Sequence, residues 1–342
     1  MAKPKYRAAI IGCGRIASLF ADDKKRRGVV THAQAYRAHP KTELIAACDL
    51  DRKRLTHFGR RWNVKALYDD LDAMMKKERP DLLSVCTGNS NHEAIVRQAV
   101  RRGVKGIICE KPISDSLEAA DRMIRLCRKK NVPLLVNYSR RYNELHHRLR
   151  AILAGGGLGD IQTVSCYYTA GVMNTGTHLF DILRFFFGDV SWVCSHPDKI
   201  LKAPDPTFDV YLYFKKGFGC TISTLDVAHY MQFEIDIYGT RGRIRIEDSG
   251  MRAQFWGTTA HQVYSGYKTL EPRKVVTAGF SHNFLAMIDN LVAACEGKQK
   301  PYCSGEDGRA AFEIAAAAHL SLRTGKKVKL PLKNKKMKLE SK

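Results

Sequence analysis

The amino-acid sequence predicts an α/β protein that begins with a doubly wound parallel sheet and continues into an α/β domain with an open, mostly antiparallel sheet. Up to about residue 138, short continuous apolar runs alternate with helix-length stretches, which is typical of parallel strands buried on both faces. After residue 160 the strands become longer and alternate apolar with polar residues between tight turns. Because the chain has 342 residues, it is long enough for two separate cores.

The expected elements follow from these two patterns. Parallel strands are expected at residues 7–12, 43–49, 81–87, 106–110 and 133–138. Hairpin turns are expected at KKGFG (215–219) and GTRG (239–242), and helices at 282–296 and 306–324. We therefore expect a first domain at 1–138, a second at 139–325 and a basic tail at 326–342.

The net charge of +23 attracts phosphates, nucleic acid or anionic membranes. The tail 326–342 holds eight lysines and one glutamate, so most of the positive charge lies in the folded part. Because the tail has few apolar residues to offset chain entropy, we expect a solvated, disordered end. A nucleic-acid partner is not expected, since the sequence has no zinc spacing, RNA-binding aromatic motif or helix-turn-helix pattern.

The ten cysteines are scattered singly, without a C-x-x-C pair, and several lie in apolar strand patterns. This favours reduced core thiols and no metal site. No apolar run reaches the roughly 18 residues that a membrane helix needs. The first strand also begins almost at the N-terminus, so a cytoplasmic protein without a membrane span is expected.

The stretch GCGRIA (12–17) directly follows the first expected strand. Gly12 permits a tight turn and Gly14 lets a pyrophosphate approach the backbone, while the following helix supplies N–H donors. The third position is Ala17 instead of glycine. This pattern predicts a dinucleotide-binding Rossmann domain, although G-x-G-x-x-A alone is a weak signal.

Asp49 ends the second expected strand, where a carboxylate accepts the ribose hydroxyls of adenosine and repels a 2′-phosphate. NAD is therefore expected, and the nearby Arg52 and Arg54 leave NADP open. The spacing from Gly14 to Asp49 exceeds the usual length of about 20 residues, because FADDKKRRGVVT (20–31) looks inserted. The alternative is that Asp49 only caps the next helix.

Two further motifs, CTGNSNH (86–92) and CEKP (109–112), lie at the carboxyl ends of expected strands. This edge of a doubly wound sheet is where ligands bind. The proline after Lys111 restricts the lysine backbone, so the side chain projects from a fixed position. The alternative is an ordinary surface lysine.

The stretch MNTGTHLFDILRFFFG (173–188) combines polar residues with an apolar helix. Its helix is expected to be anchored by one apolar face, formed by Leu179, Ile182, Leu183 and Phe186. His178 is either a base or a packed histidine, and Asn174 is either a helix N-cap or a substrate contact. Asp181 follows His178 by three residues and is expected to contact substrate or imidazole.

In NYSRRYN (137–143), Tyr138 and Arg141 are candidate substrate contacts, because a guanidinium suits a carboxylate or phosphate. The alternative is that the two adjacent arginines form a solvated pair.

These motifs, together with SGEDGRAAFEIAAAAHLSLRTGKKVKLP (304–331), resemble the glucose-fructose oxidoreductase, inositol dehydrogenase and MocA family over residues 6 to 331. The resemblance implies a Rossmann domain, a C-terminal α/β domain, bound nicotinamide, a sugar or cyclitol substrate, and a homodimer or homotetramer. The family's active-site lysine corresponds to Lys111 and its histidine to His178. The family's aspartate four residues before that histidine is replaced by Asn174.

Hydride transfer from an alcohol needs a base and a group that stabilises the alkoxide. We assign His178 as the base and Lys111 as the hydrogen-bond donor, with the exchanged roles as the alternative. The expected catalytic residues are Lys111, His178 and Asn174. The expected cofactor contacts are Gly12, Cys13, Gly14, Arg15, Ile16, Asp49, Arg54, Thr87, Asn89, His92, Glu110, Lys111 and Asn137. The expected substrate contacts are Lys111, Tyr138, Arg141, Asn174, Thr175, His178 and Asp181.

The leading functional hypothesis is an NAD-dependent oxidoreductase acting on a secondary alcohol of a sugar, a cyclitol or a sugar derivative, including a nucleotide sugar or sugar acid. The alternative is an enzyme that cleaves or epimerises a glycoside through an internal redox cycle. A third hypothesis is a non-catalytic dinucleotide sensor or nucleic-acid-binding regulator that keeps the fold.

Overall fold

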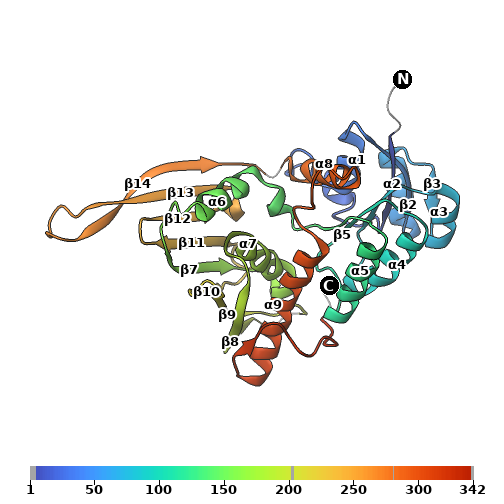
Figure 1. Cartoon of the computed structure of the whole chain (residues 1–342). Helices are drawn as coiled ribbons and strands as arrows, with labels where there is room; N and C mark the ends of the chain where they lie inside the picture. The colour runs from blue at the N-terminus through green and yellow to red at the C-terminus, as the bar shows by residue number, and fades with distance from the viewer. Residues whose placement is uncertain (1–4, 202–203, 280, 340–342) are drawn as a thin grey trace. The chain divides into compact units, whose positions relative to one another are not determined.

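The computed structural model describes residues 5–201, 204–279 and 281–339, and these residues form two compact units. The first unit consists of the described residues up to 142, together with 281–309 and 335–339. The second unit consists of the described residues from 143 to 279 together with 310–334. Each unit contains one sheet, and the predicted α/β class is confirmed (Figure 1).

The sheet of the first unit has six parallel strands in the order β3-β2-β1-β4-β5-β6. Its strands are β1 (Tyr6–Ile11), β2 (Thr42–Cys48), β3 (Ala66–Tyr68), β4 (Leu82–Val85), β5 (Gly106–Cys109) and β6 (Leu134–Val136). Five of these strands were expected from the apolar runs. Only β3 was not, because it has three residues and all of them are half-buried. The strand order reverses direction between β1 and β4, so the carboxyl edge at this point is where a doubly wound sheet binds a ligand.

Helices accompany the parallel strands, as the right-handed crossover connection requires. They are α1 (His32–Ala38), α2 (Arg52–Trp62), α3 (Leu71–Glu78), α4 (His92–Arg101), α5 (Leu117–Lys129) and α8 (Asn283–Cys295). Several begin at side chains that cap free N–H groups: Asp51 accepts hydrogen bonds at the start of α2, Asp70 at the start of α3 and Ser116 at the start of α5.

The helix expected to open at GCGRIA is interrupted. Residues 15–18 form turns, the short 3₁₀ helix η1 (Leu19–Asp22) follows, and α1 begins only at His32. The N–H groups of His32 and Ala33 donate to the carbonyl groups of Ile16 and Ala17, at 3.3 and 3.0 Å. In a continuous helix each of these carbonyl groups would accept a hydrogen bond from the N–H group four residues later. The actual donors, His32 and Ala33, come later than that by the length of the segment 20–31. The inserted segment therefore interrupts a helix that continues at His32.

The second unit has a nine-stranded sheet in the order β14-β13-β12-β11-β7-β10-β9-β8-β15. Its strands are β7 (Ile161–Tyr168), β8 (Val190–Leu201), β9 (Thr207–Phe214), β10 (Gly219–Thr224), β11 (Phe233–Gly239), β12 (Gly242–Glu247), β13 (Arg252–Ala260), β14 (Lys268–Thr277) and β15 (Val328–Lys329). All pairs are antiparallel except β7 with β10, so the expected open, mostly antiparallel sheet is confirmed. The hairpins expected at 215–219 and 239–242 join β9 to β10 and β11 to β12.

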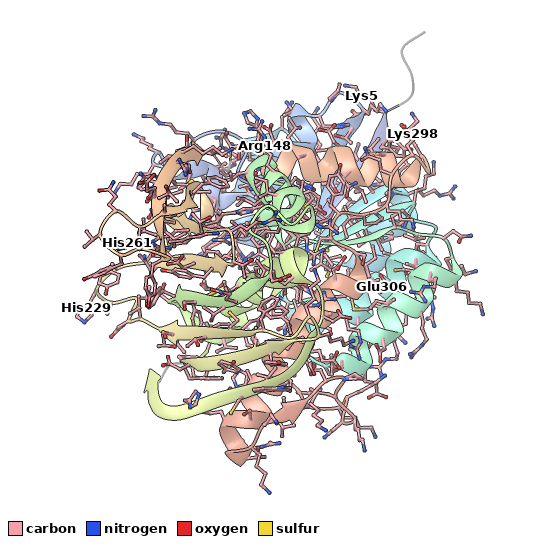
Figure 2. The ribbon with its side chains drawn as sticks, turned by 60° about the vertical axis from the view of Figure 1, so that its left-hand side comes forward. Lys5, Arg148, His229, His261, Lys298 and Glu306 are labelled. Atoms are coloured by element: carbon pink, nitrogen blue, oxygen red, sulfur yellow. The ribbon has the colours of Figure 1, made fainter. Side chains whose placement is uncertain are left out.

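The long strands β13 and β14 form a hairpin that extends past the other strands of this sheet (Figure 1). Figure 2 labels His261 in the turn of this hairpin and His229 in the loop before β11. The side chain of His261 orders this turn, because the N–H groups of Val263 and Tyr264 both donate to His261 Nδ1 at 3.1 Å.

Three helices belong wholly or partly to the second unit: α6 (Glu144–Ala154), α7 (Thr177–Phe187) and α9 (Gly305–Thr324). The four residues expected on the apolar face of α7 are buried, but so are Phe180, Phe185 and Phe187, so the helix is buried on most sides. A short π-helix, η4 (Gly171–Gly176), leads directly into α7. None of the described helices is both long and apolar enough to span a membrane.

The expectation of a disordered C-terminal tail is wrong for its described residues, 326–339. Val328 and Lys329 form β15 and pair with β8, and Leu332 is 7% exposed. Further on, the Glu118 N–H donates to the Lys335 carbonyl at 3.0 Å. The tail has few apolar residues, and it is ordered by backbone hydrogen bonds, by ion pairs of its lysines and by the burial of Leu332.

Candidate active site

The glycine-rich turn after β1 is fixed by close packing against β4. Gly12 has a φ of +85°, and a Cβ at this position would lie 2.7 Å from the carbonyl oxygen of Cys86. Glycine is therefore required both for the backbone conformation and for the contact. At Gly14 a Cβ would meet nothing within 4 Å, so the backbone there borders open space. That space is where the G-x-G pattern places a pyrophosphate.

Asp49 holds this turn against the end of β2. Its Oδ2 accepts a hydrogen bond from the Cys13 N–H at 2.7 Å, and its Oδ1 accepts one from the Asp51 N–H at 2.8 Å. Arg54 Nη2 lies 3.4 Å from Oδ1. The helix cap is Asp51, so Asp49 is not the cap of α2. Burial, and next the charge of Asp49, raise the pKa of the Cys13 thiol, which remains protonated.

A cavity of about 440 Å³ opens at this edge of the sheet. It is lined by Ile11, Gly12, Gly14, Cys48, Asp49, Leu50, Arg54, Asp69, Leu71, Cys86, Thr87, Gly88, Asn91, Ala94 and Ile95. The expected cofactor contacts Gly12, Gly14, Asp49, Arg54 and Thr87 are among them. Leu50, Leu71 and Ile95 were not predicted. They give the cavity an apolar wall, which suits the adenine ring of a dinucleotide. The high exposure of Leu50, at 86%, follows from its place at the rim.

Other expected cofactor contacts do not line this cavity. Cys13 is fully buried below the turn. Arg15 is exposed, and its guanidinium lies 5.8 Å from the centre of the Phe20 ring, while Ile16 is half-buried in the turn. Direct contact of these three residues with a cofactor remains a prediction.

Asn89 and His92 are buried and face carbonyl groups of the protein. Asn89 Nδ2 donates to the carbonyl oxygens of Ser114 and Leu339, each at 3.0 Å. The ring nitrogens of His92 lie 3.2 Å from the Ile113 carbonyl and 3.0 Å from the Thr87 carbonyl. Burial lowers the pKa of His92, so the neutral imidazole is favoured. Within the first unit, both side chains fix the loop that carries Thr87 instead of facing the cavity.

A buried polar network lies behind the CEKP motif. His32 Nε2 is 2.8 Å from Glu110 Oε1, which also accepts a hydrogen bond from Asn137 Nδ2 at 2.6 Å. Burial alone would raise the pKa of Glu110, but the hydrogen bond and charge of His32, the hydrogen bond from Asn137 and the charge of Lys111 outweigh it and lower that pKa. Glu110 is therefore an anion beneath the lysine, and its Oε2 accepts a hydrogen bond from the Lys111 N–H at 3.3 Å.

The network extends through Ser84, whose Oγ lies 3.0 Å from His32 Nδ1 and 2.9 Å from the hydroxyl of Tyr36. Sequence reasoning found Glu110 and Asn137 but missed His32, Ser84 and Tyr36. The inserted segment 20–31 hid His32, because it moves this histidine far from the glycine-rich turn in the sequence. The remaining indication of this network in the sequence was Ser84, a polar residue inside the apolar run of β4, which the structure shows to be buried.

In the second unit, the N-terminal end of η4 is held by Asp205. Its carboxylate accepts hydrogen bonds from the N–H groups of Met173 and Asn174, at 2.9 and 2.8 Å. Gly171 has a φ of +86°, and a Cβ there would overlap the same carboxylate. The interpretation of Asn174 as the N-cap is therefore wrong, since Asp205 satisfies the free donors that an N-cap would bind. Sequence reasoning missed Asp205, which lies in the turn PDP (204–206).

The expected substrate residues of this segment differ in exposure. Asn174 is exposed, Thr175 and His178 are half-buried, and Asp181 is fully buried. π-Helical turns inside helices are frequent at functional sites, because they displace side chains from regular helical spacing. Asn174 in η4 and His178 in the first turn of α7 lie on one continuous helical segment, Asn174 exposed and His178 half-buried.

Arg141 is not part of a solvated arginine pair. It is 5% exposed, and its Nη1 lies 3.1 Å from Asp307 Oδ1 and donates to the Tyr302 carbonyl at 3.1 Å. Burial also lowers the pKa of the neighbouring Arg140 to about 10. Tyr138 is fully buried. Substrate contact of Tyr138 and Arg141 stays a prediction, and the guanidinium of Arg141 is already engaged within the first unit.

Together, the doubly wound sheet, the glycine-rich turn and the carboxylate at the end of β2 define a dinucleotide-binding Rossmann domain. A family model for the NAD-binding Rossmann fold of an oxidoreductase family matches residues 6–138, and the model for the C-terminal alpha/beta domain of this family matches residues 170–330. The chain belongs to this glucose-fructose oxidoreductase, inositol dehydrogenase and MocA family, and its cofactor is NAD.

Relatives match along nearly the whole chain. The D-apiose dehydrogenase of Paraburkholderia graminis is 24% identical over an alignment of 358 positions, gaps included, which covers 95% of this chain and 90% of the relative. The myo-inositol 2-dehydrogenase of Thermotoga maritima is 25% identical over an alignment of 346 positions, gaps included, which covers 95% of this chain and 98% of the relative. The crystal structure of the WlbA dehydrogenase from Bordetella pertussis, in complex with NADH and UDP-GlcNAcA, has a TM-score of 0.75 at 20% identity, covering 96% of this chain and 99% of that chain.

We expect Asp49→Ser to reduce the preference for NAD over NADP, because it removes both the ribose acceptor and the charge that repels a 2′-phosphate. Arg54 stays in place beside the cavity. The measurement is the ratio of the two dissociation constants. Asp51→Ser is the matched control, since it removes one carboxylate two residues away and keeps a residue type that caps α2. Equal binding of both cofactors by the unaltered protein would contradict the assignment of Asp49.

Asp205→Ala should lower the free energy of unfolding by about 1–2 kcal/mol, because two N–H groups at the start of η4 lose their acceptor. Asp205→Asn, which keeps one carbonyl acceptor, should lose less. Chemical denaturation measures both values. Equal stability of Asp205→Ala and the unaltered protein would show that water replaces the carboxylate at no cost.

Proposed function

We propose that this protein is an NAD-dependent dehydrogenase that oxidises a secondary alcohol of a sugar, a cyclitol or a sugar derivative such as a sugar acid or nucleotide sugar. The observation that carries the proposal is the similarity, over nearly the whole chain, to dehydrogenases named for a pentose and for a cyclitol. The net charge of +23 favours substrates that carry an acid or phosphate group.

NAD, when bound, accepts the hydride from the carbon that carries the hydroxyl group. The chain must then remove the hydroxyl proton and stabilise the oxygen as negative charge develops on it. We assign proton removal to His178, because histidine is the side chain that most often acts as a general base. We assign the hydrogen bond to the oxygen to Lys111, with the exchanged roles as the alternative.

The first unit supports the role of Lys111. Its backbone follows β5 at the carboxyl edge of the sheet, between the anionic Glu110 and Pro112. The buried network of His32, Glu110 and Asn137 fixes that edge. A fixed backbone at this edge limits the region that the ammonium group of Lys111 reaches, which favours correct positioning against a substrate.

The second unit supports the role of His178 in a similar way. α7 is anchored by its buried faces, and Asp205 fixes the turn that precedes it. The histidine is half-buried at the start of the helix, so its position is constrained.

The proposal is tested by incubating the purified protein with NAD and a panel of free sugars, sugar acids, cyclitols and nucleotide sugars. Net formation of NADH with one class identifies the dehydrogenase and its substrate class. Substrate conversion without net NADH identifies the internal redox cycle instead, because that cycle returns the hydride within each turnover. Neither reaction with any member of the panel would contradict the proposed function.

We also propose that the protein is a homodimer or homotetramer that associates through the open face of the nine-stranded sheet. Burial alternates along β9, β11 and β12, so the other face of these strands is only partly covered. Tyr167 on the central strand β7 is 41% exposed. Light scattering after size exclusion measures the oligomer, and a monomer at micromolar concentration would contradict the proposal.

A further inference from the structure

The C-terminal segment Lys335–Leu339 lies on the start of α5 within the first unit. The Glu118 N–H donates to the Lys335 carbonyl at 3.0 Å, and the Leu339 N–H donates to the Asp115 carbonyl at 2.8 Å. Lys335 Nζ is 2.8 Å from Asp121 Oδ2, and Lys338 Nζ is 3.5 Å from Asp115 Oδ2. Backbone hydrogen bonds at both ends and two ion pairs thus hold this basic segment against an acidic surface.

Asn89 connects this segment to the wall of the NAD cavity. It is 3% exposed, and one amide group, Nδ2, donates to both the Leu339 and the Ser114 carbonyl. Asn89 begins the 3₁₀ helix η2 (Asn89–Asn91), directly after Thr87 and Gly88. Thr87, Gly88 and Asn91 all line the cavity. The residue between them is therefore anchored both by the C-terminal segment, through Leu339, and by Ser114.

We propose that residues 335–339 act as a brace that holds the loop 87–91 in the conformation that binds NAD. Asn89, Lys335 and Lys338 are then positioning residues for the cofactor. This inference rests on the cavity as the NAD site. Because the two ion pairs are partly exposed, salt weakens them, and the brace loosens as ionic strength rises.

The loss of the brace should appear in cofactor binding and in the mobility of one loop. A chain that ends at Asn334 should bind NADH about three- to tenfold more weakly, the scale of losing one hydrogen bond that positions the wall. Lys335→Ala with Lys338→Ala should show a smaller change in the same direction, and the arginine pair at these positions should restore the affinity. Fluorescence titration of NADH measures these dissociation constants without a sugar substrate.

The matched control is Lys326→Ala with Lys333→Ala, which removes the same two charges from exposed tail positions outside the segment. Hydrogen exchange of the protein without cofactor gives the second readout. In the truncated chain, amides 87–92 should exchange faster, while amides of β1 and the thermal midpoint stay unchanged.

Unchanged affinity and unchanged exchange of 87–92 after truncation would overturn the brace. Equal weakening by the control pair would also overturn it, because the total charge would then explain the effect. Failure of the unaltered protein to bind NADH would overturn the cofactor site itself, and with it the inference. Binding without turnover on the substrate panel contradicts only the proposed function.

Discussion

We expect Lys111→Ala to lower kcat by about 10²-fold or more, which is the contribution of a positioned proton donor or base. The affinity for NAD should stay within about threefold, because Lys111 does not line the described cavity. This pattern assigns the lost interaction to the transition state instead of to cofactor binding. Steady-state kinetics with the substrate found in the panel and a direct titration of NADH measure the two quantities.

A lysine at the opposite end of the same strand provides the control. Lys105 precedes β5 and is paired with Asp81 at 2.8 Å, so Lys105→Ala removes the same charge far from the carboxyl edge. Its kcat should stay within about twofold, as for other surface substitutions. Near-normal turnover of Lys111→Ala would show that this lysine is an ordinary surface residue.

Lys111→Arg separates charge from proton transfer. Arginine keeps the positive charge but does not release a proton near neutral pH. If Lys111 only donates a hydrogen bond, part of the activity should remain. If it is the base, as in the alternative assignment, Lys111→Arg should be as inactive as Lys111→Ala.

The strands were predictable where burial on both faces produced continuous apolar runs, as in β1, β4 and β5. The short strand β3 was not, because three half-buried residues give no run. The change of sequence pattern along the chain also did not predict that α8 belongs to the first compact unit. That association depends on contacts between segments far apart in the sequence, such as His39 Nε2 with Asp289 Oδ1 at 2.9 Å.

The part of the site that local motifs encode was predictable. Gly12, Gly14 and Asp49 follow strand ends directly, and the structure places all three at one cavity. The supporting residues were not predictable, because they come from distant segments. Asp205 fixes Asn174 from 31 residues away, and His32 reaches Glu110 across 78 residues. Neither contact has a signature in local spacing.

The tail shows the limit of composition as a guide. Its lysines and few apolar residues predicted a disordered end, which the described residues 326–339 do not form. Composition does not report the acceptors on another segment that order a polar chain, here the carbonyl of Asp115 and the carboxylate of Asp121.

Asn174→Asp should move the acid limb of the kcat/KM profile to higher pH. An aspartate on the same helical segment stabilises the protonated imidazole of His178 and so raises its pKa. Because only the neutral ring accepts the hydroxyl proton, a higher pKa removes the active form at a higher pH. A shift of one pH unit corresponds to about 1.4 kcal/mol of differential interaction between the two protonation states.

The carboxylate of Asp205 sets the size of this effect. The Asp205 carboxylate already accepts a hydrogen bond from the Asn174 N–H at 2.8 Å. A second carboxylate at position 174 would therefore lie beside Asp205, and the two negative charges would repel each other. We therefore expect a shift of about one unit or less. Asp205→Asn should move the limb in the opposite direction, to lower pH, and Asn174→Ser should leave it in place because serine is neutral.

His178→Asn should abolish the acid limb and lower kcat by about 10²-fold or more, since asparagine cannot accept the proton. The two results together separate chemistry from packing. A packed histidine would lower the stability of His178→Asn without altering the pH profile of the activity that remains. Full activity of His178→Asn, with the limb unmoved in Asn174→Asp, would show that His178 is only a packed residue of α7. Loss of activity with the limb still present would instead assign the titrating base to Lys111, whose pKa must then be lowered by burial and by the cationic nicotinamide.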